Sequence, residues 1–410
     1  MLHLKIAAII SEYNPLHNGH LYHINKTREE ANADAVICVM SGNFVQRGTP
    51  ALIDKWKRTD FALNNGIDLV IELPVLYSLS SAEFFAYGAV SLLNSLGIVD
   101  ILSFGSECGS AETLLDFAQI LAEEPEELSN DIKHYLKEGI PFPSARGKAL
   151  YDYIKNNNKE NIEESLTNLL NCSNNILGIE YCKSLIKLSS SIKPFSIQRE
   201  GGNYNSNALN NIFSSATSIR KYISENNSIE GLERHVPEYV FNNLQTLISS
   251  NYNFVFEDSI IPYVKYKYFS SGSSIENLPD VSEGIHNKIF KALENFNSHK
   301  DIVSNIKSKR YTYTRINRIL CQYFVGFEQY NTNALRKEPC PYARILGFNK
   351  TGAEVLKKIK DNSSIPYYTK LPKESNDVLK LDLQSTKVFS LLNRNVLPTS
   401  DYITSPLIIK

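Results

Sequence analysis

Residues 5–23 read KIAAIISEYNPLHNGHLYH, an apolar run followed at once by a histidine-rich segment. The run Lys5–Ile10 has the composition of a buried β-strand. The residues after it predict a turn into a helix. In open α/β sheets, ligands bind beyond the carboxyl ends of the strands, and the free N–H groups of a helix that starts there can hold phosphate. The segment therefore predicts both the first strand of an α/β sheet and a candidate binding site.

The chain then repeats this alternation of short apolar runs and longer amphipathic ones. Three further strand candidates are Ala35–Met40, Leu69–Leu73 and Ile101–Phe104, and the helix candidates are residues 18–31, 54–65 and 80–96. Such alternation is typical of βαβ units in a parallel sheet. We therefore expect the α/β fold class for this part of the chain.

The later part of the chain predicts a change of architecture. Residues 174–188 predict an amphipathic helix, and the polar stretch 155–164 predicts a surface helix end or an insertion. A helix led by Ser and Thr, within residues 213–223, closes the first domain. Helical segments without strand periodicity follow. We expect an α/β domain at residues 1–228 and a mainly helical domain at residues 229–410.

Composition and length favour a soluble protein with two cores. The chain has 410 residues, and single cores usually stop growing near about 250 residues. No apolar stretch reaches the ~18 to 20 residues that a membrane span needs, and the first apolar run lacks the features of a secretory signal. The six cysteines show no CxxC pair and no metal-like spacing. We expect a cytoplasmic location and no membrane partner.

Three histidines follow the first strand. His17 and His20 are three residues apart, so they share one face of the expected helix, and Gly19 leaves room for a nucleotide near the backbone. The pair can act on a bound phosphate, cap a surface helix or, with His23, hold zinc. Positions i, i+3 and i+6 converge poorly on one ion, which makes zinc the weakest interpretation. The position of the pair at the end of a strand favours phosphate.

Seven blocks of sequence, spread through most of the chain, carry a family resemblance. They are SEYNPLHNGHLYH (11–23), SGNFVQRGTPALIDKWKR (41–58), SFGSE (103–107), NNILGIEY (174–181), FSSATSIR (213–220), SKRYTYTRINRIL (308–320) and YARILGFNKTG (342–352). The first contains the HxGH signature of the nucleotidyltransferase superfamily. Together, in this order, the blocks resemble the tRNA(Met) cytidine acetate ligase family.

The resemblance implies a fold and a reaction. The fold is a Rossmann-like, HUP-type nucleotidyltransferase domain with a parallel sheet, followed by a mainly helical domain. The implied enzyme is an ATP-dependent ligase. It forms acetyl-adenylate from acetate and ATP with release of pyrophosphate. It then transfers the acetyl group to N4 of the wobble cytidine (C34) of elongator tRNA(Met), which gives N4-acetylcytidine.

The resemblance also implies site residues, with His17 and His20 as the catalytic pair. The residues implied to bind ATP are Ile10, Ser11, Glu12, Tyr13, Asn14, His17, Asn18, Gly19, His20, His23, Gly105, Asn174, Arg199, Ser215 and Arg220. Mg²⁺ is expected to accompany ATP, although the sequence shows no ligand motif for it. The catalytic site itself is expected to hold no metal bound by protein ligands.

From the residues alone, ordinary structural roles stay open for several of these positions. Gly105 can end a strand at a turn, Asn174 and Ser215 can cap helices, and Arg199 can form a surface ion pair. The block 213–220 resembles the phosphate motif ISSTxIR, but Ala216 departs from it, which leaves the individual hydroxyl roles open.

A polar set in the block 41–58 follows the second strand. Its members are Asn43, Gln46, Arg47, Asp54, Lys55 and Arg58. Such a set at the rim of a sheet can bind acetate or triphosphate. It can equally be a solvated charged face, and the sequence does not decide between the two.

The net charge of −1 is unevenly distributed, because residues 307–360 hold twelve Lys and Arg against three acidic residues. Bases alternate with tyrosines at the start of this region, a pattern that suits a phosphate track with stacking surfaces. The residues expected to bind tRNA are Lys309, Arg310, Arg315 and Arg318. The alternative is a solvated charged face with Tyr311 and Tyr313 in the core.

Two rival functions remain. One is a small-molecule adenylyltransferase or pantothenate synthetase-like enzyme on the same first domain. The other is a non-catalytic RNA-binding module with a vestigial nucleotide site. Intact His17, Gly19 and His20 argue against the module, and the basic segment with its tyrosines argues against the small-molecule enzyme.

Overall fold

A computed structural model of the chain describes residues 4–157, 170, 172–199, 214–271 and 274–410. Most of the polar stretch 155–164 lies outside the described residues, as does the segment that follows Arg199 up to residue 213. The described part contains no helix that is both long and apolar enough to cross a membrane.

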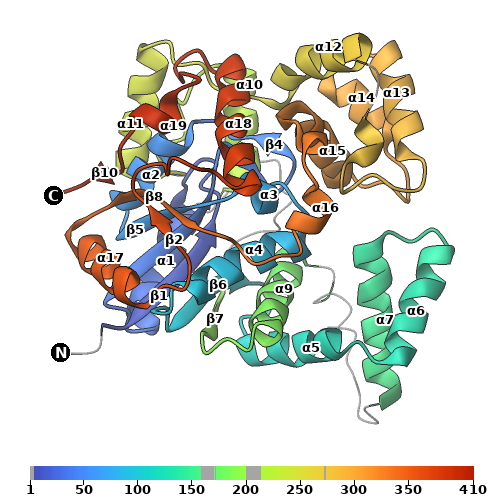
Figure 1. The fold of residues 1–410 in the computed structure, drawn as a ribbon, viewed down its shortest axis with the longest axis horizontal. Helices are drawn as coiled ribbons and strands as arrows, with labels where there is room; N and C mark the ends of the chain where they lie inside the picture. The colour runs from blue at the N-terminus through green and yellow to red at the C-terminus, as the bar shows by residue number, and fades with distance from the viewer. Residues whose placement is uncertain (1–3, 158–169, 171, 200–213, 272–273) are drawn as a thin grey trace.

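An eight-stranded sheet organises the molecule (Figure 1). The strands are β1 (Ile6–Ser11), β2 (Ala35–Ser41), β5 (Leu69–Leu73), β6 (Ile101–Ser106), β7 (Lys193–Gln198), β8 (Ala343–Phe348), β9 (Tyr367–Tyr368) and β10 (Leu407–Ile408), beside a separate hairpin of β3 (Phe44–Val45) and β4 (Thr49–Pro50). Five strands follow the order β5-β2-β1-β6-β7, and all neighbours among them are parallel. The strand order reverses between β1 and β6, which is where doubly wound sheets bind ligands.

The helices of the first half connect these strands, and several of them cover the sheet, whereas α6 and α7 pack on each other beside it (Figure 1). They are α1 (Asn18–Glu30), α2 (Lys55–Leu63), α3 (Val75–Ser78), α4 (Ala82–Ser95), α5 (Ala111–Glu123), α6 (Glu126–Lys137), α7 (Phe142–Asn157), α9 (Ser173–Lys187) and α10 (Ala216–Asn226). The four predicted strands and the helices predicted at 18–31, 54–65, 80–96 and 174–188 are confirmed, with ends that differ by at most two residues. The helix predicted within residues 213–223 is α10, which begins and ends three residues later.

The second half is mostly helical, and Figure 1 shows α12 to α16 gathered beside the sheet. Its helices are α11 (Glu238–Ser249), α12 (Ile261–Ser271), α13 (Ile285–Asn295), α14 (His299–Ile306), α15 (Tyr313–Val325), α16 (Thr332–Leu335), α17 (Lys350–Asn362), α18 (Asp377–Leu392) and α19 (Ser400–Ile403), with 3₁₀ turns η1 (Glu257–Ile260), η2 (Ile275–Asn277) and η3 (Phe327–Gln329). The predicted α/β class with a helical second part is confirmed.

The C-terminal segment nevertheless returns to the first sheet, which the sequence did not predict. Strand β8 pairs antiparallel with β5, and the two-residue strands β9 and β10 pair parallel with β8. A single apolar run such as Ala343–Phe348 cannot be told from a buried helix turn by its periodicity. The predicted boundary at residues 228 and 229 stays a prediction, but the segment 343–410 shares its sheet with residues 6–106.

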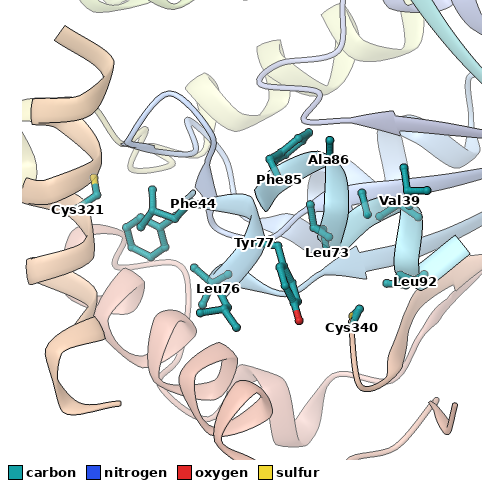
Figure 2. Close-up of a cluster of buried hydrophobic side chains, with 14 of the residues drawn as sticks. Val39, Phe44, Leu73, Leu76, Tyr77, Phe85, Ala86, Leu92, Cys321 and Cys340 are labelled. Atoms are coloured by element: carbon teal, nitrogen blue, oxygen red, sulfur yellow. The ribbon is translucent and has the colours of Figure 1, made fainter. Parts of the chain in front are cut away.

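The sheet separates two hydrophobic cores, because alternate strand residues point to opposite faces. In β1, Ile6 and Ala8 belong to one core, whereas Ala7 and Ile9 belong to the other. The first core continues into the helical part: Figure 2 shows Phe44 and Leu76 near Cys321 of α15. A continuous core means that the sheet and the α12–α18 region stabilise each other.

Helix α17 approaches the sheet so closely that only glycine fits at position 352. A Cβ atom there would lie 2.0 Å from the carbonyl oxygen of Asp68 and 2.9 Å from Cβ of Phe348. Asn349, the N-cap of α17, also binds Asp68 through its side-chain amide at 2.9 Å. Backbone atoms cannot move aside as a flexible side chain would.

We therefore expect Gly352→Ala to lower the free energy of unfolding by about 1–3 kcal/mol through overpacking. Gly147→Ala is the matched control, because its added Cβ would lie 3.7 Å from the nearest neighbouring atom, within ordinary van der Waals distance. This helix-interior change should stabilise the protein by about 0.5–1 kcal/mol. Urea unfolding of both variants measures the difference. Equal midpoints for Gly352→Ala and the wild type would contradict the close packing of α17.

Candidate functional site

The histidine segment lies at the carboxyl end of β1, beside the end of β6, where the strand order reverses. His17 is the N-cap of α1: its Nδ1 accepts the N–H of Gly19 at 3.1 Å. His20 completes the cap in return, because its Nδ1 accepts the N–H of His17 at 3.2 Å. The two rings stack with centroids 3.7 Å apart. The pair therefore caps the helix, and the capping bonds fix the orientation of both rings.

The capping bonds also determine which ring nitrogen carries the proton. Because Nδ1 of each ring is an acceptor, the neutral rings hold their proton on Nε2. Burial, aided by the positive charge of Arg199, lowers the pKa of His17 to about 3. Burial also lowers the pKa of His20 well below its usual value. The site thus presents two neutral imidazoles with Nε2–H as the donor.

Tyr13 supports His20 from the side. Its ring meets the ring of His20 edge-on, with centroids 5.0 Å apart, and the side chain is fully enclosed. The backbone of Tyr13 has φ +46°, a left-handed conformation that is uncommon for a bulky residue. The next residue, Asn14, accepts the N–H of Leu52 at 2.8 Å and an N–H of Arg220 at 3.2 Å through Oδ1. These contacts hold the turn between β1 and α1 in place.

His23 lies one turn along α1 and is engaged with the neighbouring strand. Its Nε2 lies 3.1 Å from Oγ of Ser103 in β6, and Thr27 reaches the same hydroxyl at 2.7 Å. Burial, and then the charge of Arg199, lower the pKa of His23 to about 4. Among the residues that the structure describes, no three His, Cys, Asp or Glu side chains are placed to hold a metal ion.

Gly105, Asn174 and Arg199 lie close to one another, and the charge of Arg199 acts on the histidines. Arg199 Nη1 donates to Oδ1 of Asn174 at 3.4 Å, and a Cβ on Gly105 would lie 3.3 Å from Cγ of Arg199. Asn174 is not the N-cap of α9, which begins after Cys172. The carboxylate of Glu107 serves the start of α9 instead, since it accepts from the amide side chain of Asn174 at 2.6 Å and from the backbone of Asn175 at 2.9 Å.

Helix α10 brings its own N-terminus to the site. Ser215 is the N-cap, with Oγ accepting the N–H of Ser218 at 3.1 Å. His235 links this helix start to α1: its Nδ1 lies 2.9 Å from Oγ of Ser214, and its carbonyl accepts the N–H of Asn18 at 3.1 Å. Two helix N-termini are therefore fixed side by side, which favours an anion between them.

Arg220 of α10 is paired in this structure. Its Nη2 lies 2.7 Å from a carboxylate oxygen of Glu257, which belongs to η1. Burial alone would raise the pKa of Glu257, but the charge of Arg220 holds it below its usual value. Arg220 therefore connects the histidine segment, through Asn14, with η1 directly before α12.

Most of the polar set of the block 41–58 is buried and does not form a solvated face. Arg58 is fully buried and donates to the carbonyls of Ile53, Ser41 and Glu12 at 3.0, 2.9 and 2.8 Å, and also to that of Gly42. Burial lowers its pKa to about 10. Asp54 caps α2, and Asn43 binds the N–H of Lys55 at 3.0 Å. These residues stabilise the loop.

Lys55 belongs to a buried group of four charges. Its Nζ lies 2.7 Å from Glu72 and 2.8 Å from Asp401, and Arg344 lies 3.5 and 3.0 Å from the same two carboxylates. Burial and then the carboxylate of Glu72 raise the pKa of the nearby Asp382 to about 7. The group fastens the end of β5 to β8 and α19, which assigns Lys55 and Arg344 a structural task.

Gln46 and Arg47 lie close to Glu12, at the start of the histidine segment. The N–H of Gln46 donates to Oε1 of Glu12 at 2.7 Å, and both Gln46 and Arg47 are only half-buried. Burial raises the pKa of the Glu12 carboxyl. The interpretation that this loop contributes to a binding rim thus stays open for these two residues.

The four residues predicted to bind tRNA have different surroundings. Lys309 and Arg310 are exposed, and so is the neighbouring Tyr313. Arg315 donates to the carbonyl of Asp280 at 3.0 Å and to Oγ of Ser282 at 2.6 Å.

Arg318 is buried in an ion pair with Asp280 at 2.7 Å, and Arg336 binds the other oxygen at 3.1 Å. A phosphate contact by Arg318 would need this arrangement to open. Its role in tRNA binding stays a prediction that the geometry does not favour. The alternative to tRNA binding placed Tyr311 and Tyr313 in the core. Tyr311 is indeed buried, whereas Tyr313 is exposed.

Sequence reasoning missed three residues that shape the site. Ser103 orients His23, His235 joins the two helix starts, and Glu257 pairs with Arg220. The signal for Ser103 was present, since a polar residue stands within the apolar strand β6. His235 and Glu257 lie outside any recognisable motif, and only the tertiary structure brings them here.

Comparison with known proteins agrees with this geometry. A family model described as HIGH Nucleotidyl Transferase matches residues 4–401, so the chain belongs to that family. Within it, the chain is 57% identical over 412 residues to the tRNA(Met) cytidine acetate ligase of Clostridium kluyveri, with 99% of each chain covered.

Two solved structures match the whole chain at 32% sequence identity. The apo form of Thermotoga maritima TmcAL superimposes with a TM-score of 0.89 over 99% of each chain. The form of that protein bound with alpha-thio ATP superimposes with a TM-score of 0.86 and covers 98% of this chain and 99% of the other. The resemblance to the tRNA(Met) cytidine acetate ligase family is thereby confirmed.

The lowered histidine pKa values predict a dependence of stability on pH. In the unfolded chain a histidine binds a proton below about pH 6.5, whereas folded His23 stays neutral down to about pH 4. Acidification through this window therefore favours the unfolded state. Each such histidine should cost about 2 kcal/mol of stability between pH 7 and pH 5.

We expect His23→Gln, whose amide can still reach Ser103, to lose less stability than the wild type on acidification, by about 2 kcal/mol. Urea unfolding at pH 7 and pH 5 measures this. The control is His134→Gln, because His134 is exposed on α6. An unchanged pH dependence in His23→Gln would mean that His23 is not buried in the neutral form.

Proposed function

We propose that this chain is an ATP-dependent tRNA(Met) cytidine acetate ligase. The observation that carries the proposal is the pair of neutral, mutually capping imidazoles, His17 and His20, at the end of β1. The identity to the Clostridium kluyveri tRNA(Met) cytidine acetate ligase over the full chain supports the same activity. In this proposal the enzyme makes acetyl-adenylate and then N4-acetylcytidine at the wobble position of elongator tRNA(Met).

In the first step an acetate oxygen attacks the α-phosphorus of ATP. The new P–O bond forms as the bond to the β,γ-diphosphate breaks, and pyrophosphate leaves with the added negative charge. Neutral Nε2–H donors suit this step, because each can donate a hydrogen bond to the negative charge that develops on the phosphate oxygens. The capping bonds hold both donors in position before the substrate arrives, so little reorganisation is needed.

The remaining ATP contacts follow from the two helix starts and the arginine beside them. The N-termini of α1 and α10 provide backbone N–H groups, and Arg199 adds a positive charge next to the histidines. Arg220 can serve phosphate only if its ion pair with Glu257 loosens or is shared. The match to the Thermotoga protein bound with alpha-thio ATP supports a nucleotide at this place.

Magnesium is proposed to enter as the complex with ATP. The described part of the chain offers no cluster of three metal-binding side chains. The phosphate oxygens themselves are the hard ligands that Mg²⁺ prefers. We therefore assign no protein ligand to it and no role beyond accompanying the phosphates.

In the second step N4 of the cytidine attacks the acetyl carbonyl. The new C–N bond forms, the bond to the AMP oxygen breaks so that AMP leaves with the electron pair, and the proton lost from N4 is released to solvent. A wobble base in an anticodon loop is single-stranded, so it can enter an active site without opening a duplex. AMP is the product that leaves.

The test of the chemistry is acetate-dependent exchange of pyrophosphate into ATP, followed by nucleoside analysis of tRNA(Met) incubated with labelled acetate. We expect AMP and pyrophosphate as products. His20→Asn keeps a side-chain acceptor for the His17 N–H but removes the Nε2–H donor. It should lower the exchange rate by about 100-fold or more while urea unfolding stays close to that of the wild type.

His134→Asn, at an exposed position on α6, is the control and should exchange at the wild-type rate. A folded His20→Asn variant with full exchange activity would remove His20 from the chemistry. Accumulation of ADP in the wild type would replace acetyl-adenylate with an acyl-phosphate mechanism. Exchange with a larger carboxylate and no tRNA acetylation would favour the small-molecule adenylyltransferase.

The exposed basic residues before α15 are proposed to hold tRNA. Lys309→Ala with Arg310→Ala should weaken tRNA binding and reduce the slope of log affinity against log salt by about 0.7 to 0.9 for each phosphate that is no longer bound. Acetate-dependent exchange without tRNA should be unchanged. Lys357→Ala with Lys360→Ala, two lysines on α17, is the matched control. Equal salt slopes for both double variants would place the RNA elsewhere.

A further inference from the structure

Helix α12 has an exposed aromatic stripe that the proposed chemistry does not use. Pro262, Tyr263, Tyr266 and Phe269 are all exposed, and their spacing places them on one face of the helix. Tyr266 is 74% and Phe269 is 59% exposed, which is high for large apolar side chains on a helix that packs well on its other face. Figure 1 places α12 at the outer margin of the α12–α15 group.

The opposite face of α12 is fully used. Val264 is buried in the core, Tyr268 stacks on Phe290 with ring centroids 4.9 Å apart, and Lys267 forms an ion pair with Glu328 at 2.5 Å. The helix therefore needs no partner to be stable. Its exposed aromatic residues are therefore not needed to complete the hydrophobic core.

The stripe continues onto helix α18. The hydroxyl of Tyr263 donates to the carbonyl of Leu391 at 3.1 Å, and Leu391 itself is exposed. Lys387 lies one turn before Leu391, and Arg394 lies three residues after it, both exposed. We call the surface formed by Tyr263, Tyr266, Phe269, Leu391, Lys387 and Arg394 the α12–α18 face.

The charges on this face are positive. On α12 the charge beside this face is that of Lys265, since Lys267 is paired with Glu328 on the opposite side of the helix. Lys265 lies 5.7 Å from the ring centroid of Phe269, and its hydrogen-bond partners, Asn297 and the carbonyl of Phe296, are uncharged. Three carboxylates near α12 are already engaged: Glu257 with Arg220, Asp258 with the N–H of His299, and Glu294 with the hydroxyl of Tyr268 at 3.2 Å.

We propose that the α12–α18 face binds unpaired nucleotides of the RNA substrate, with Tyr266 and Phe269 stacking on bases and Lys265, Lys387 and Arg394 facing phosphates. Aromatic rings beside cations are what single-stranded RNA requires. An apolar protein partner would not need the cations, and an acidic one would not need two flat rings at successive turns. The inference rests on the proposed function, since it presumes an RNA substrate.

This face is distinct from the basic residues Lys309 and Arg310. Those residues precede the first turn of α15, whereas α12 meets the other end of that helix, where Tyr263 lies 5.8 Å from Phe324 between ring centroids. A helix of thirteen residues spans about 20 Å at 1.5 Å per residue. The two surfaces therefore lie near opposite ends of α15, and one RNA molecule bound to both would extend along this helix.

The test uses two double variants of the full chain. Tyr266→Ala with Phe269→Ala removes both rings, and we expect tRNA affinity to fall by about fivefold or more for each ring removed. Tyr266→Leu with Phe269→Leu keeps an apolar surface but cannot stack, so it should lose affinity to a similar extent. Tyr402→Ala with Ile403→Ala, exposed residues on α19, should bind tRNA as the wild type does.

Binding is measured with tRNA(Met) and with a single-stranded anticodon-loop oligonucleotide, beside light scattering for the oligomeric state. Wild-type affinity in both double variants would overturn the proposal. Weaker binding by the Ala variant with full binding by the Leu variant would replace stacking by simple apolar contact. A dimer that dissociates in the Ala variant would make this face a contact between copies of the chain. Acetate-dependent exchange without tRNA reports separately on the proposed function.

Discussion

The mutual capping of His17 and His20 is the interaction on which the site depends. A helix N-terminus leaves backbone N–H groups without partners, and here two ring nitrogens satisfy two of them. The same bonds occupy Nδ1 of each ring and leave Nε2 to carry the proton, while burial keeps the rings neutral. Helix capping and charge stabilisation were rival interpretations of the sequence. In the structure one arrangement caps the helix and leaves both Nε2–H groups free for the charge stabilisation that we propose.

The sequence predicted the parts of the fold whose signals are local. Strands β1, β2, β5 and β6 are buried runs rich in apolar residues, and α1, α2, α4 and α9 have clear starts. The histidine motif, Gly105, Asn174 and Arg199 were placed by resemblance and do converge. Such features need only a few consecutive residues to be recognised.

The rest depends on contacts between distant segments, which no local pattern records. Lys55 and Arg344 are charged, and composition alone suggests that they face water, yet each is buried against Glu72 and Asp401. Burial of a charge is tolerated only when partners surround it. Those partners lie 17 to 346 residues away from Lys55 in the chain. Strand β8 and the buried position of Arg318 went unrecognised for the same reason.

These distant contacts also connect the candidate site to the helical part of the chain. The β3–β4 hairpin binds Glu12 through the N–H of Gln46, and its Gly48 carbonyl accepts from the thiol of Cys321 at 3.1 Å. Gly48 has φ +80°, and a Cβ there would lie 2.2 Å from the backbone nitrogen of Arg318. No side chain fits between the hairpin and α15. Helix α15 and the hairpin that binds Glu12 are therefore packed backbone against backbone, close to the turn that carries the histidines.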